Sequence, residues 1–441
     1  MDQNVLLIVC DTLRKDIMQL YGGEAKTPYI NKLAKDSVVY DNAIAPSPWT
    51  FPSHVSLFTG LYPSRHGIHE TRTVKIEGMA DVHKTLKNER IAQHLQSKGY
   101  STIGVSNNLM VSRFTHFDPG FDYFFNIEAS PWTRSKIASE ALSLGLNVNQ
   151  VAFELIKKGR FGEVFKFGKE FMRVRSLAET IDYPFNKGAE LTNDLLFNTN
   201  LTPNFFLFIN FYEMHDPYKG SGNKEFQDHF AGVKDISESS LGYLKNQYLL
   251  EAEFLDRNIG RLIETLKMRD LYDDTMIIFT ADHGQAFNEH GFMYHSIYLY
   301  DEIIRIPLVI KYPKGRKFKI REGYQSLVSI PKLIKDVLRG GDDSSLTSDM
   351  VFSESFGNEN RLPESYKHRL DYVMEKYEKV RKAVYKDGYK LSLNGSDGTI
   401  EEFVKGNRKI EAKDHKKVLK DLIEEIDQFR GSESFKLPGG P

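Results

Sequence analysis

The sequence has a single cysteine, Cys10, among its 441 residues, which excludes an internal disulfide framework. The fold therefore does not depend on an oxidising compartment. An excess of charge of one sign is also missing, because 59 lysine and arginine residues balance 60 aspartate and glutamate residues and leave a formal net charge of -1. Nucleic-acid-binding proteins usually carry a strongly basic surface, so this balance gives no sign of such a partner.

Long hydrophobic runs are absent as well. No stretch reaches the ~20 apolar residues that span a bilayer. Residues 1–4 contain no basic side chain, and the apolar run at residues 5–10 is too short for the core of a secretory leader. Hydrophobic residues make up 40% of the chain and charged residues 27%, as in soluble globular proteins. We therefore expect a cytoplasmic protein without a membrane segment.

What the chain does have is a series of apolar runs of strand length, separated by helix-like patterns. Such runs suit strands buried on both faces of a mostly parallel sheet, and their alternation with helices predicts an α/β fold with helices on both faces. Ligands of these folds bind at the carboxyl ends of the strands, where Asp11 and Asp282 follow their runs. The runs are residues 5–10, 102–105, 205–211, 276–279 and 307–310, and the helical patterns include residues 29–37, 89–98 and 248–267.

The composition suggests two domains, at residues 1–325 and 326–441. Residues 129–192 read as a helical insertion in the first domain, which either covers the mouth of a site or only packs on the sheet. In the second, residues 379–385 and 389–393 resemble strands joined by a turn at 386–388, and residues 414–430 resemble a closing amphipathic helix with Asp414 as its N-cap. We expect a small α+β subdomain there.

Three short segments carry candidate chemistry. Asp282-His283-Gly284 follows a strand, so a carboxylate and an imidazole can reach one divalent cation, although the aspartate can equally cap a helix. Asp11 likewise is either a metal ligand or the cap of the following helix. Thr50, in Thr50-Phe51-Pro52-Ser53-His54, is either a turn residue or a nucleophile, and a free threonine hydroxyl needs a metal ion or a base to activate it.

The order and spacing of these segments resemble those of the sulfatase family of the alkaline phosphatase superfamily. Five further motifs take part in the resemblance: Thr27-Pro28, Thr59-Gly60, Tyr62-Pro63, His66-Gly67 and His290-Gly291. The resemblance implies a large mixed, mostly parallel sheet of the alkaline phosphatase type and a metal-dependent hydrolase of anionic sulfate or phosphate esters. It covers most of the chain apart from the insertion, and extends to Tyr248, Asp256 and Arg305.

The resemblance also implies a site. Asp11, Thr50, Asp282 and His283 correspond to ligands of one divalent ion, and Thr50 to the nucleophile. His215 corresponds to a histidine near the leaving group and is either a general acid or a loop-fixing residue. His54, Asn107 and His295 stand at or near positions of cationic substrate contacts, and their alternatives are packing or turn roles.

The chain departs from the family pattern in its nucleophile. Sulfatases proper carry a cysteine or serine there that becomes formylglycine, and Thr50 cannot follow that route. Threonine-dependent relatives include phosphodiesterases and phosphotransferases, so a phosphoryl-group transferase is one alternative and a non-catalytic binding protein another.

The metal expected from the resemblance is a single ion, since Asp216 lacks the histidine four residues on that two-metal members carry. Thr12 replaces a second aspartate, which removes an oxygen ligand that calcium prefers. Mn²⁺, Zn²⁺, Ca²⁺ and Mg²⁺ all stay open.

Overall fold

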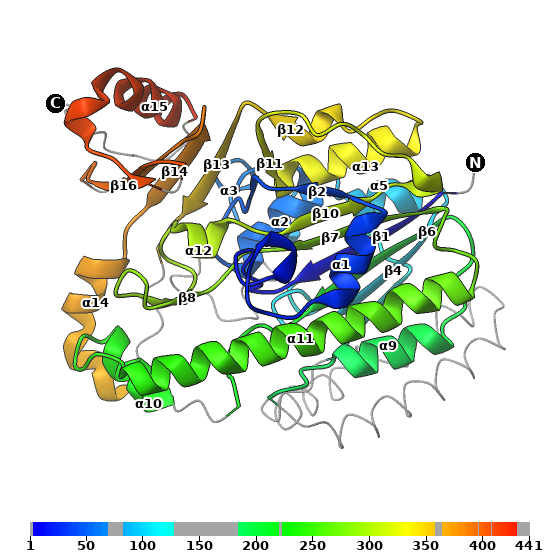
Figure 1. Ribbon diagram of the computed structural model, residues 1–441, viewed down its shortest axis with the longest axis horizontal. Helices are drawn as coiled ribbons and strands as arrows, with labels where there is room; N and C mark the ends of the chain where they lie inside the picture. The colour runs from blue at the N-terminus through cyan, green and yellow to red at the C-terminus, as the bar shows by residue number, and fades with distance from the viewer. Residues whose placement is uncertain are drawn as a thin grey trace.

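The computed structural model describes residues 3–68, 83–127, 184–219, 223–357, 364–395, 397–406 and 408–429. A seven-stranded sheet in the order β2-β10-β7-β1-β6-β4-β5 forms the centre of the fold (Figure 1). Its strands are β1 (Asn4–Cys10), β2 (Val38–Tyr40), β4 (Ser101–Ser106), β5 (Tyr123–Asn126), β6 (Phe205–Phe211), β7 (Thr275–Ala281) and β10 (Leu308–Lys311).

The three central strands β1, β6 and β7 are buried along their whole length, which explains why their sequences are continuous apolar runs. They pair in parallel, as do β4 with β6 and β5 with β4, whereas β10 runs antiparallel to β7 and β2. The predicted fold class, a mixed and mostly parallel sheet, is confirmed.

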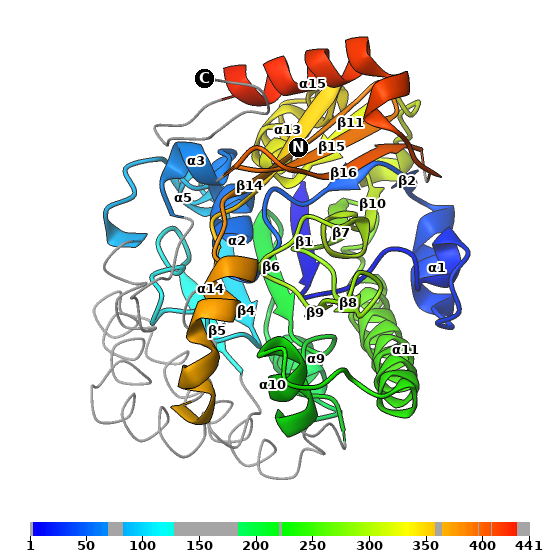
Figure 2. The same ribbon diagram turned by 90° about the vertical axis from the view of Figure 1, so that its left-hand side faces the viewer.

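Helices cover both faces of this sheet (Figures 1 and 2). On one face, α1 (Pro28–Lys35) and α9 (Ala189–Asn198) both contact the long helix α11 (Glu238–Met268). On the other face, α2 (Thr50–Thr59) contacts α5 (Ile91–Ser97) and α13 (Ile330–Leu338). Asp256 of α11 accepts hydrogen bonds from the backbone N–H groups of Tyr29 and Ile30, so it caps the first turn of α1 from another helix.

A second sheet forms the C-terminal part. Its five antiparallel strands lie in sequence order: β13 (Met350–Ser355), β14 (Arg381–Lys386), β15 (Tyr389–Asn394), β16 (Ile400–Lys405) and β17 (Arg408–Lys409). The predicted turn joins β14 to β15, where Asp387 and Gly388 both adopt positive φ, the geometry of a tight hairpin. Helix α15 (Lys416–Gln428) packs on this sheet. The expected C-terminal α+β subdomain is therefore present.

The short elements complete the described chain. They are the strands β3 (Ala43–Ile44), β8 (Ala286–Phe287), β9 (Met293–Tyr294), β11 (Tyr324–Ser326) and β12 (Thr347–Ser348), the α-helices α3 (Pro63–His66), α10 (Asn223–Phe230), α12 (Asp301–Ile304) and α14 (Leu370–Tyr377), and the 3₁₀ turns Gln19–Tyr21, Pro313–Gly315, Leu327–Ser329, Ser344–Leu346, Glu364–Arg369 and Ala412–Asp414.

Three expectations from the sequence differ from the structure or fall outside it. Asp414 does not cap the last helix, because it ends a 3₁₀ turn and α15 begins at Lys416 after His415. Helix α11 begins at Glu238, ten residues before the predicted start, with the Ser237 hydroxyl accepting from the N–H of Ser240. Most of the predicted insertion at 129–192 lies outside the described residues, and its described end enters α9. The boundary at 325/326 stays a prediction.

None of the described helices is both long enough and apolar enough to cross a membrane.

Candidate active site

The register of the central sheet sets Asp11 and Asp282 side by side. Cys10, the last residue of β1, pairs with Ala281, the last residue of β7, so the two aspartates are the next residues of neighbouring parallel strands. Both are fully buried. The N–H groups of Thr12 and His283 donate to Oδ1 of Asp282 at 3.2 and 2.8 Å, which fixes that carboxylate.

His283 brings its ring to the two carboxylates. Its Nε2 lies 4.0 Å from Oδ1 of Asp11 and 3.5 Å from Oδ2 of Asp282. Its Nδ1 donates to the carbonyl oxygen of Gly284 at 2.9 Å, and such a bond holds a histidine with Nε2 available as a ligand. Gly284 is needed for close packing, because a Cβ atom there would lie 2.2 Å from the carbonyl oxygen of Glu302.

Thr50 reaches the same carboxylate and imidazole from helix α2. It is the first residue of α2, after Trp49 in extended conformation, and its side chain is buried. Its Oγ1 lies 3.4 Å from Oδ2 of Asp11 and 3.3 Å from Nε2 of His283. The amino end of a helix also favours negative charge, which suits an anionic group next to Thr50.

The electrostatics of this cluster favour a cation. Burial, and for Asp11 also the neighbouring Asp282, raises the pKa of each aspartate to about 7. Oδ1 of Asp11 and Oδ2 of Asp282 are buried with no hydrogen-bond partner among the described residues. One ligand atom from each of Asp11, Asp282 and His283 lies within 4.8 Å of the others. Two carboxylates and an imidazole are a donor set that fits a divalent metal ion.

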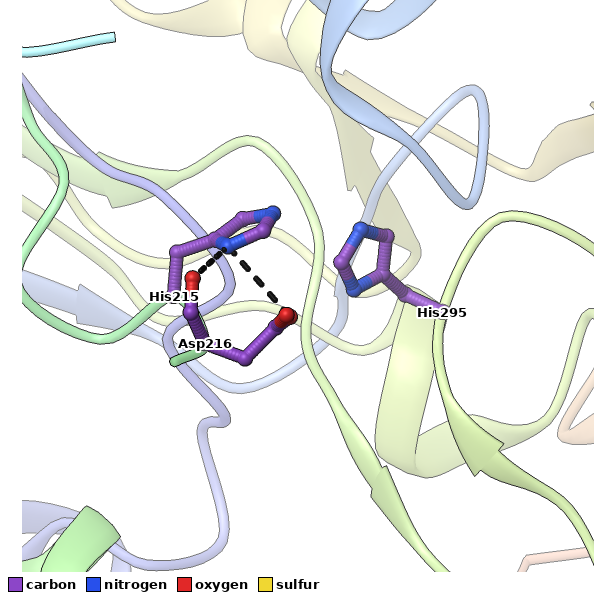
Figure 3. Close-up of side chains that lie close together, drawn as sticks. All are labelled: His215, Asp216 and His295. Carbon is purple, nitrogen blue, oxygen red and sulfur yellow. Dashed lines mark hydrogen bonds and ion pairs between the residues drawn. The ribbon is translucent and has the colours of Figure 1, made fainter. Parts of the chain in front are cut away.

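His215 and His295 lie next to the cluster, and His215 is the more exposed of the two. The two rings are 5.0 Å apart, and the His295 ring is 4.6 Å from that of His283. Figure 3 shows the His215 ring directed toward His295, with Asp216 beside it. His215 follows β6, and its ring stacks on that of Tyr212. The structure thus brings both predicted histidines close to the candidate metal ligands, while their roles stay predictions.

His54 lies behind the site. Its side chain is fully buried, with Nδ1 donating to the carbonyl oxygen of Thr50 at 2.9 Å and Nε2 accepting from Nδ2 of Asn210 at 3.0 Å. Nδ1 is also 3.5 Å from Oδ2 of Asp282. Both ring nitrogens are engaged by the protein, so in this structure His54 supports Thr50 and Asp282, and the substrate contact expected from the sequence stays a prediction.

The hydrogen bonds shown for Asn107 do not include the candidate metal ligands. Its Nδ2 donates to the carbonyl oxygen of Ile127 at 2.7 Å and to the hydroxyl of Thr192 at 3.1 Å, which ties the end of β4 to α9. The site contact is made one residue later, where Nδ2 of Asn108 donates to Oδ2 of Asp11 at 2.5 Å. The family resemblance pointed to Asn107, one residue before the asparagine that contacts Asp11.

Two further residues hold the site in place: Gln285, which no motif of the sequence singled out, and Tyr248, which was named only as part of the family resemblance. Gln285 accepts from Nδ1 of His295 at 2.6 Å and donates to the hydroxyl of Tyr218 at 3.0 Å. Tyr248 donates to the carbonyl oxygen of Thr12 and accepts from the N–H of Arg14, which secures the loop after β1. Gln285 directly follows Asp282-His283-Gly284, and this position in the sequence could have marked it as a residue of the site.

The fold and the cluster define an α/β protein with a carboxylate–imidazole centre and a hydroxyl at the carboxyl ends of its strands. The profile of the sulfatase family matches residues 3–339, more than half of the chain. The chain belongs to the sulfatase family of the alkaline phosphatase superfamily. Enzymes of this family use a divalent metal ion.

Known proteins agree with this assignment. Human iduronate 2-sulfatase is 25% identical over 367 residues, which cover 74% of this chain and 62% of that enzyme's length. A 2-O GAG sulfatase structure superposes with a TM-score of 0.64 at 14% identity, covering 99% of this chain and 95% of the other. The phosphonate monoester hydrolase of Agrobacterium radiobacter superposes with a TM-score of 0.58 at 16% identity, covering 89% of this chain and 87% of that one. The structural similarities support the fold.

Proposed function

We propose that the chain is a metal-dependent hydrolase that cleaves sulfate or phosphate esters, including diesters, through nucleophilic attack by Thr50. The observation that carries the proposal is the position of the Thr50 hydroxyl, 3.4 Å from Asp11 and 3.3 Å from His283, at the amino end of α2. Similarity to both a sulfatase and a phosphonate monoester hydrolase supports the range of esters.

Asp11, Thr50, Asp282 and His283 would hold the ion, with Mn²⁺, Zn²⁺, Ca²⁺ and Mg²⁺ as candidates. When bound, it lowers the pKa of the Thr50 hydroxyl and polarises the ester oxygen. Thr50, having lost its proton to solvent, forms a bond to phosphorus or sulfur as the bond to the leaving oxygen breaks. His215 donates a proton to that oxygen. A water oxygen then bonds to the phosphorus or sulfur as the bond to Thr50 Oγ1 breaks, and protons from that water restore His215 and the Thr50 hydroxyl. His295, whose ring lies 4.6 Å from that of His283, would contact the anionic oxygens.

Turnover of a substrate panel tests this proposal. Aryl sulfate, aryl phosphate, a bis-aryl phosphate and an aryl phosphonate are incubated with wild type, Thr50→Ala and Thr50→Ser in the presence of each divalent ion. Loss of a nucleophile in other hydrolases costs roughly 10³–10⁶-fold in turnover, so Thr50→Ala should lose its activity and Thr50→Ser should keep a measurable part. Full activity in Thr50→Ala, or no turnover of any ester with any ion, contradicts the mechanism.

The alternative acceptor is an alcohol, which would make the chain a phosphoryl-group transferase through the same Thr50 intermediate. Its distinction from a hydrolase lies in the products. With glycerol added to the reaction, a hydrolase releases mainly the inorganic anion, whereas a transferase forms a glycerol ester in preference to it.

A further inference from the structure

A cavity of about 610 Å³ lies between the end of α10, the turn that joins β8 to β9, and α14. Both views of the fold place α14 beside α10 (Figures 1 and 2). The volume is typical of pockets that hold small molecules. Its lining, drawn from the described residues, includes none of the candidate metal ligands. We propose that this cavity binds a hydroxylated anion of sugar size, such as a sugar phosphate or a sugar acid.

The walls of the cavity are packed on one another, so the cavity is built into the fold. The ring of Phe230, at the end of α10, stacks 4.6 Å from that of Tyr377 in α14. Phe292, between β8 and β9, lies 5.8 Å from the same tyrosine ring. Arg369, the residue before α14, donates to the carbonyl oxygen of Gly232 beyond α10. A cavity formed before the ligand arrives costs little ordering on binding.

His229 lines the cavity and indicates a polar ligand. Its side chain is 7% exposed, and neither ring nitrogen has a hydrogen-bond partner of ordinary geometry among the described residues. Nδ1 is 3.7 Å from a carboxylate oxygen of Asp235, beyond hydrogen-bond distance. Burial lowers the pKa of His229 and the charge of Lys376 acts in the same direction, against Asp235 and the backbone of Gly291. A ligand that bonds to this imidazole would remove the cost of burying it unpaired.

The turn between β8 and β9 adds a second unpaired polar atom. Oδ1 of Asn288, which also lines the cavity, is buried without a hydrogen-bond partner in the part of the chain that the structure describes. The backbone of Asn288 has a φ of 70°, its N–H donates to the carbonyl oxygen of Phe292, and its own carbonyl oxygen accepts from Gly291. The turn is therefore fixed. Since an amide oxygen only accepts, Asn288 requires a hydroxyl or N–H donor from the ligand.

Two ammonium groups give the cavity its positive charge. Nζ of Lys376 donates to the hydroxyl of Tyr372, one turn earlier in α14, at 3.0 Å, and both residues line the cavity. Lys234 lines it from the loop after α10. Asp235 brings a carboxylate, but its side chain is fully exposed, so solvent screens its charge. The balance of charge favours an anion.

These groups together define the chemistry of the ligand. The two lysines suit a phosphate or a carboxylate, whereas Asn288 and His229 suit hydroxyl groups on the same molecule. An apolar molecule would leave both buried polar groups unpaired. A sugar phosphate and a sugar acid each offer the anion and the hydroxyls together. Binding here does not depend on the chemistry proposed for Thr50.

Isothermal titration of the full chain tests the site with named probes. Glucuronate and glucose 6-phosphate are titrated beside glucose and inorganic phosphate. Glucose 6-phosphate is titrated into Thr50→Ala, which lacks the proposed nucleophile. We expect at least one of the two acids to bind about 10-fold or more tightly than glucose and phosphate, because each of those probes lacks one half of the contacts.

Three substitutions remove one contact each. Lys376→Met and Asn288→Gly should each weaken binding by about 10-fold, and glycine accepts the positive φ at position 288. His229→Phe fills similar space without nitrogen atoms. Its thermal midpoint without ligand should equal or exceed that of wild type, because an unpaired buried polar group is removed, while the rise caused by the ligand should disappear. A purely structural histidine would show the opposite, a lower midpoint.

Lys332→Met is the matched control, since Lys332 pairs with Asp336 on α13 and its loss should leave binding unchanged. Asp282→Asn should also retain binding, because it alters only the candidate metal centre. Circular dichroism shows whether each variant folds. The proposal is overturned if neither acid binds, if glucose binds as tightly as both acids, or if binding survives Lys376→Met and His229→Phe. Failure of the Thr50 mechanism would instead appear as unchanged turnover in Thr50→Ala, so the two results are separable.

Discussion

Nδ2 of Asn108 donates a hydrogen bond of 2.5 Å to Oδ2 of Asp11. The donor follows β4 and the acceptor follows β1, so the bond joins the ends of two strands that β6 separates in the sheet. Oδ1 of Asn108 in turn accepts from the N–H of Met110 at 2.8 Å, which fixes the amide. Asn108 therefore orients the carboxylate of Asp11 from outside the ligand set.

Replacement of Asn108 should weaken the metal site. Asn108→Ala removes the bond to Asp11, and loss of such a supporting residue costs about 10–100-fold in metal affinity. Isothermal titration with Mn²⁺ measures the dissociation constant. Asn107→Ala is the control, because its side chain bonds Ile127 and Thr192 and its loss should lower stability without a comparable change in metal affinity. Equal affinities in wild type and Asn108→Ala would contradict the assignment.

Metal binding should stabilise the fold. Two buried carboxylates with unpaired oxygens oppose folding when they are ionised, and a bound cation removes that penalty. A ligand at 100 times its dissociation constant adds about 2.7 kcal/mol to the free energy of unfolding. Thermal denaturation with and without the metal should show a rise in the midpoint for wild type. Asp282→Asn keeps the shape but removes a charge, and its midpoint should respond much less to the metal.

Gly284→Ala should damage the site through a backbone clash. The added Cβ would lie 2.2 Å from the carbonyl oxygen of Glu302, and the N–H of Gly284 also bonds the carbonyl oxygen of Ile303. Overpacking of this kind typically costs about 1–3 kcal/mol, to be measured by denaturant unfolding. The strand-end segment should move with it, so metal affinity should fall as well.

Gly242 provides the matched glycine. It lies within α11, and a Cβ there would meet nothing within 4 Å. Gly242→Ala should therefore stabilise the protein by about 0.5–1 kcal/mol, because alanine loses less backbone freedom in a helix. If Gly284→Ala and Gly242→Ala changed stability equally, the clash at Gly284 would not explain the effect of Gly284→Ala.

His83 should make the fold sensitive to acid. Burial, followed by the nearby Arg90, lowers the pKa of His83 to about 3, whereas an unfolded histidine titrates near 6.5. Below pH 6.5 the unfolded chain therefore binds a proton that the folded chain does not. The contribution of this group to stability is lost as pH falls from 6.5 toward 3, by at most about 1.4 kcal/mol per pH unit.

The measurement compares unfolding of wild type and His83→Gln between pH 7 and pH 4. Glutamine can still donate to the carbonyl oxygen of Thr115, which His83 Nδ1 contacts at 2.7 Å. The variant should lose less stability over this range than wild type. His290→Gln should not reproduce that gain, since Glu302 raises the pKa of His290 rather than lowering it. Parallel pH profiles for wild type and His83→Gln would show that His83 does not titrate as expected.

The parts of the structure that depend on burial could be predicted from the sequence. The strands β1, β6 and β7 are buried on both faces, so their apolar runs mark them without ambiguity. The position of Asp11 and Asp282 at strand ends follows from the same runs. The start of α11 was missed because its first buried residue is Leu244, and the turns before it carry no apolar pattern.

Features that depend on spatial proximity could not be predicted from residue patterns alone, and only the family resemblance placed His215 and His295 in one site. His215 and His295 are 80 residues apart along the chain, yet their rings lie 5.0 Å from each other. The bond from Asn108 to Asp11 could not be predicted either, because Asn107 and Asn108 are adjacent and only the packing at the end of β4 decides which of them reaches Asp11. The burial of His54 behind Thr50 depends on how α2 packs on the sheet.

The pairing of Cys10 with Ala281 makes the active centre a product of sheet alignment. Side chains alternate between the faces of a strand, so a shift of β1 by one residue would exchange the buried sides of the whole strand and carry Asp11 out of reach of Asp282. The register of β1 therefore determines both the packing of the hydrophobic core and the positions of the candidate metal ligands. A single-residue deletion inside β1 would remove the centre even though every one of its side chains is still encoded.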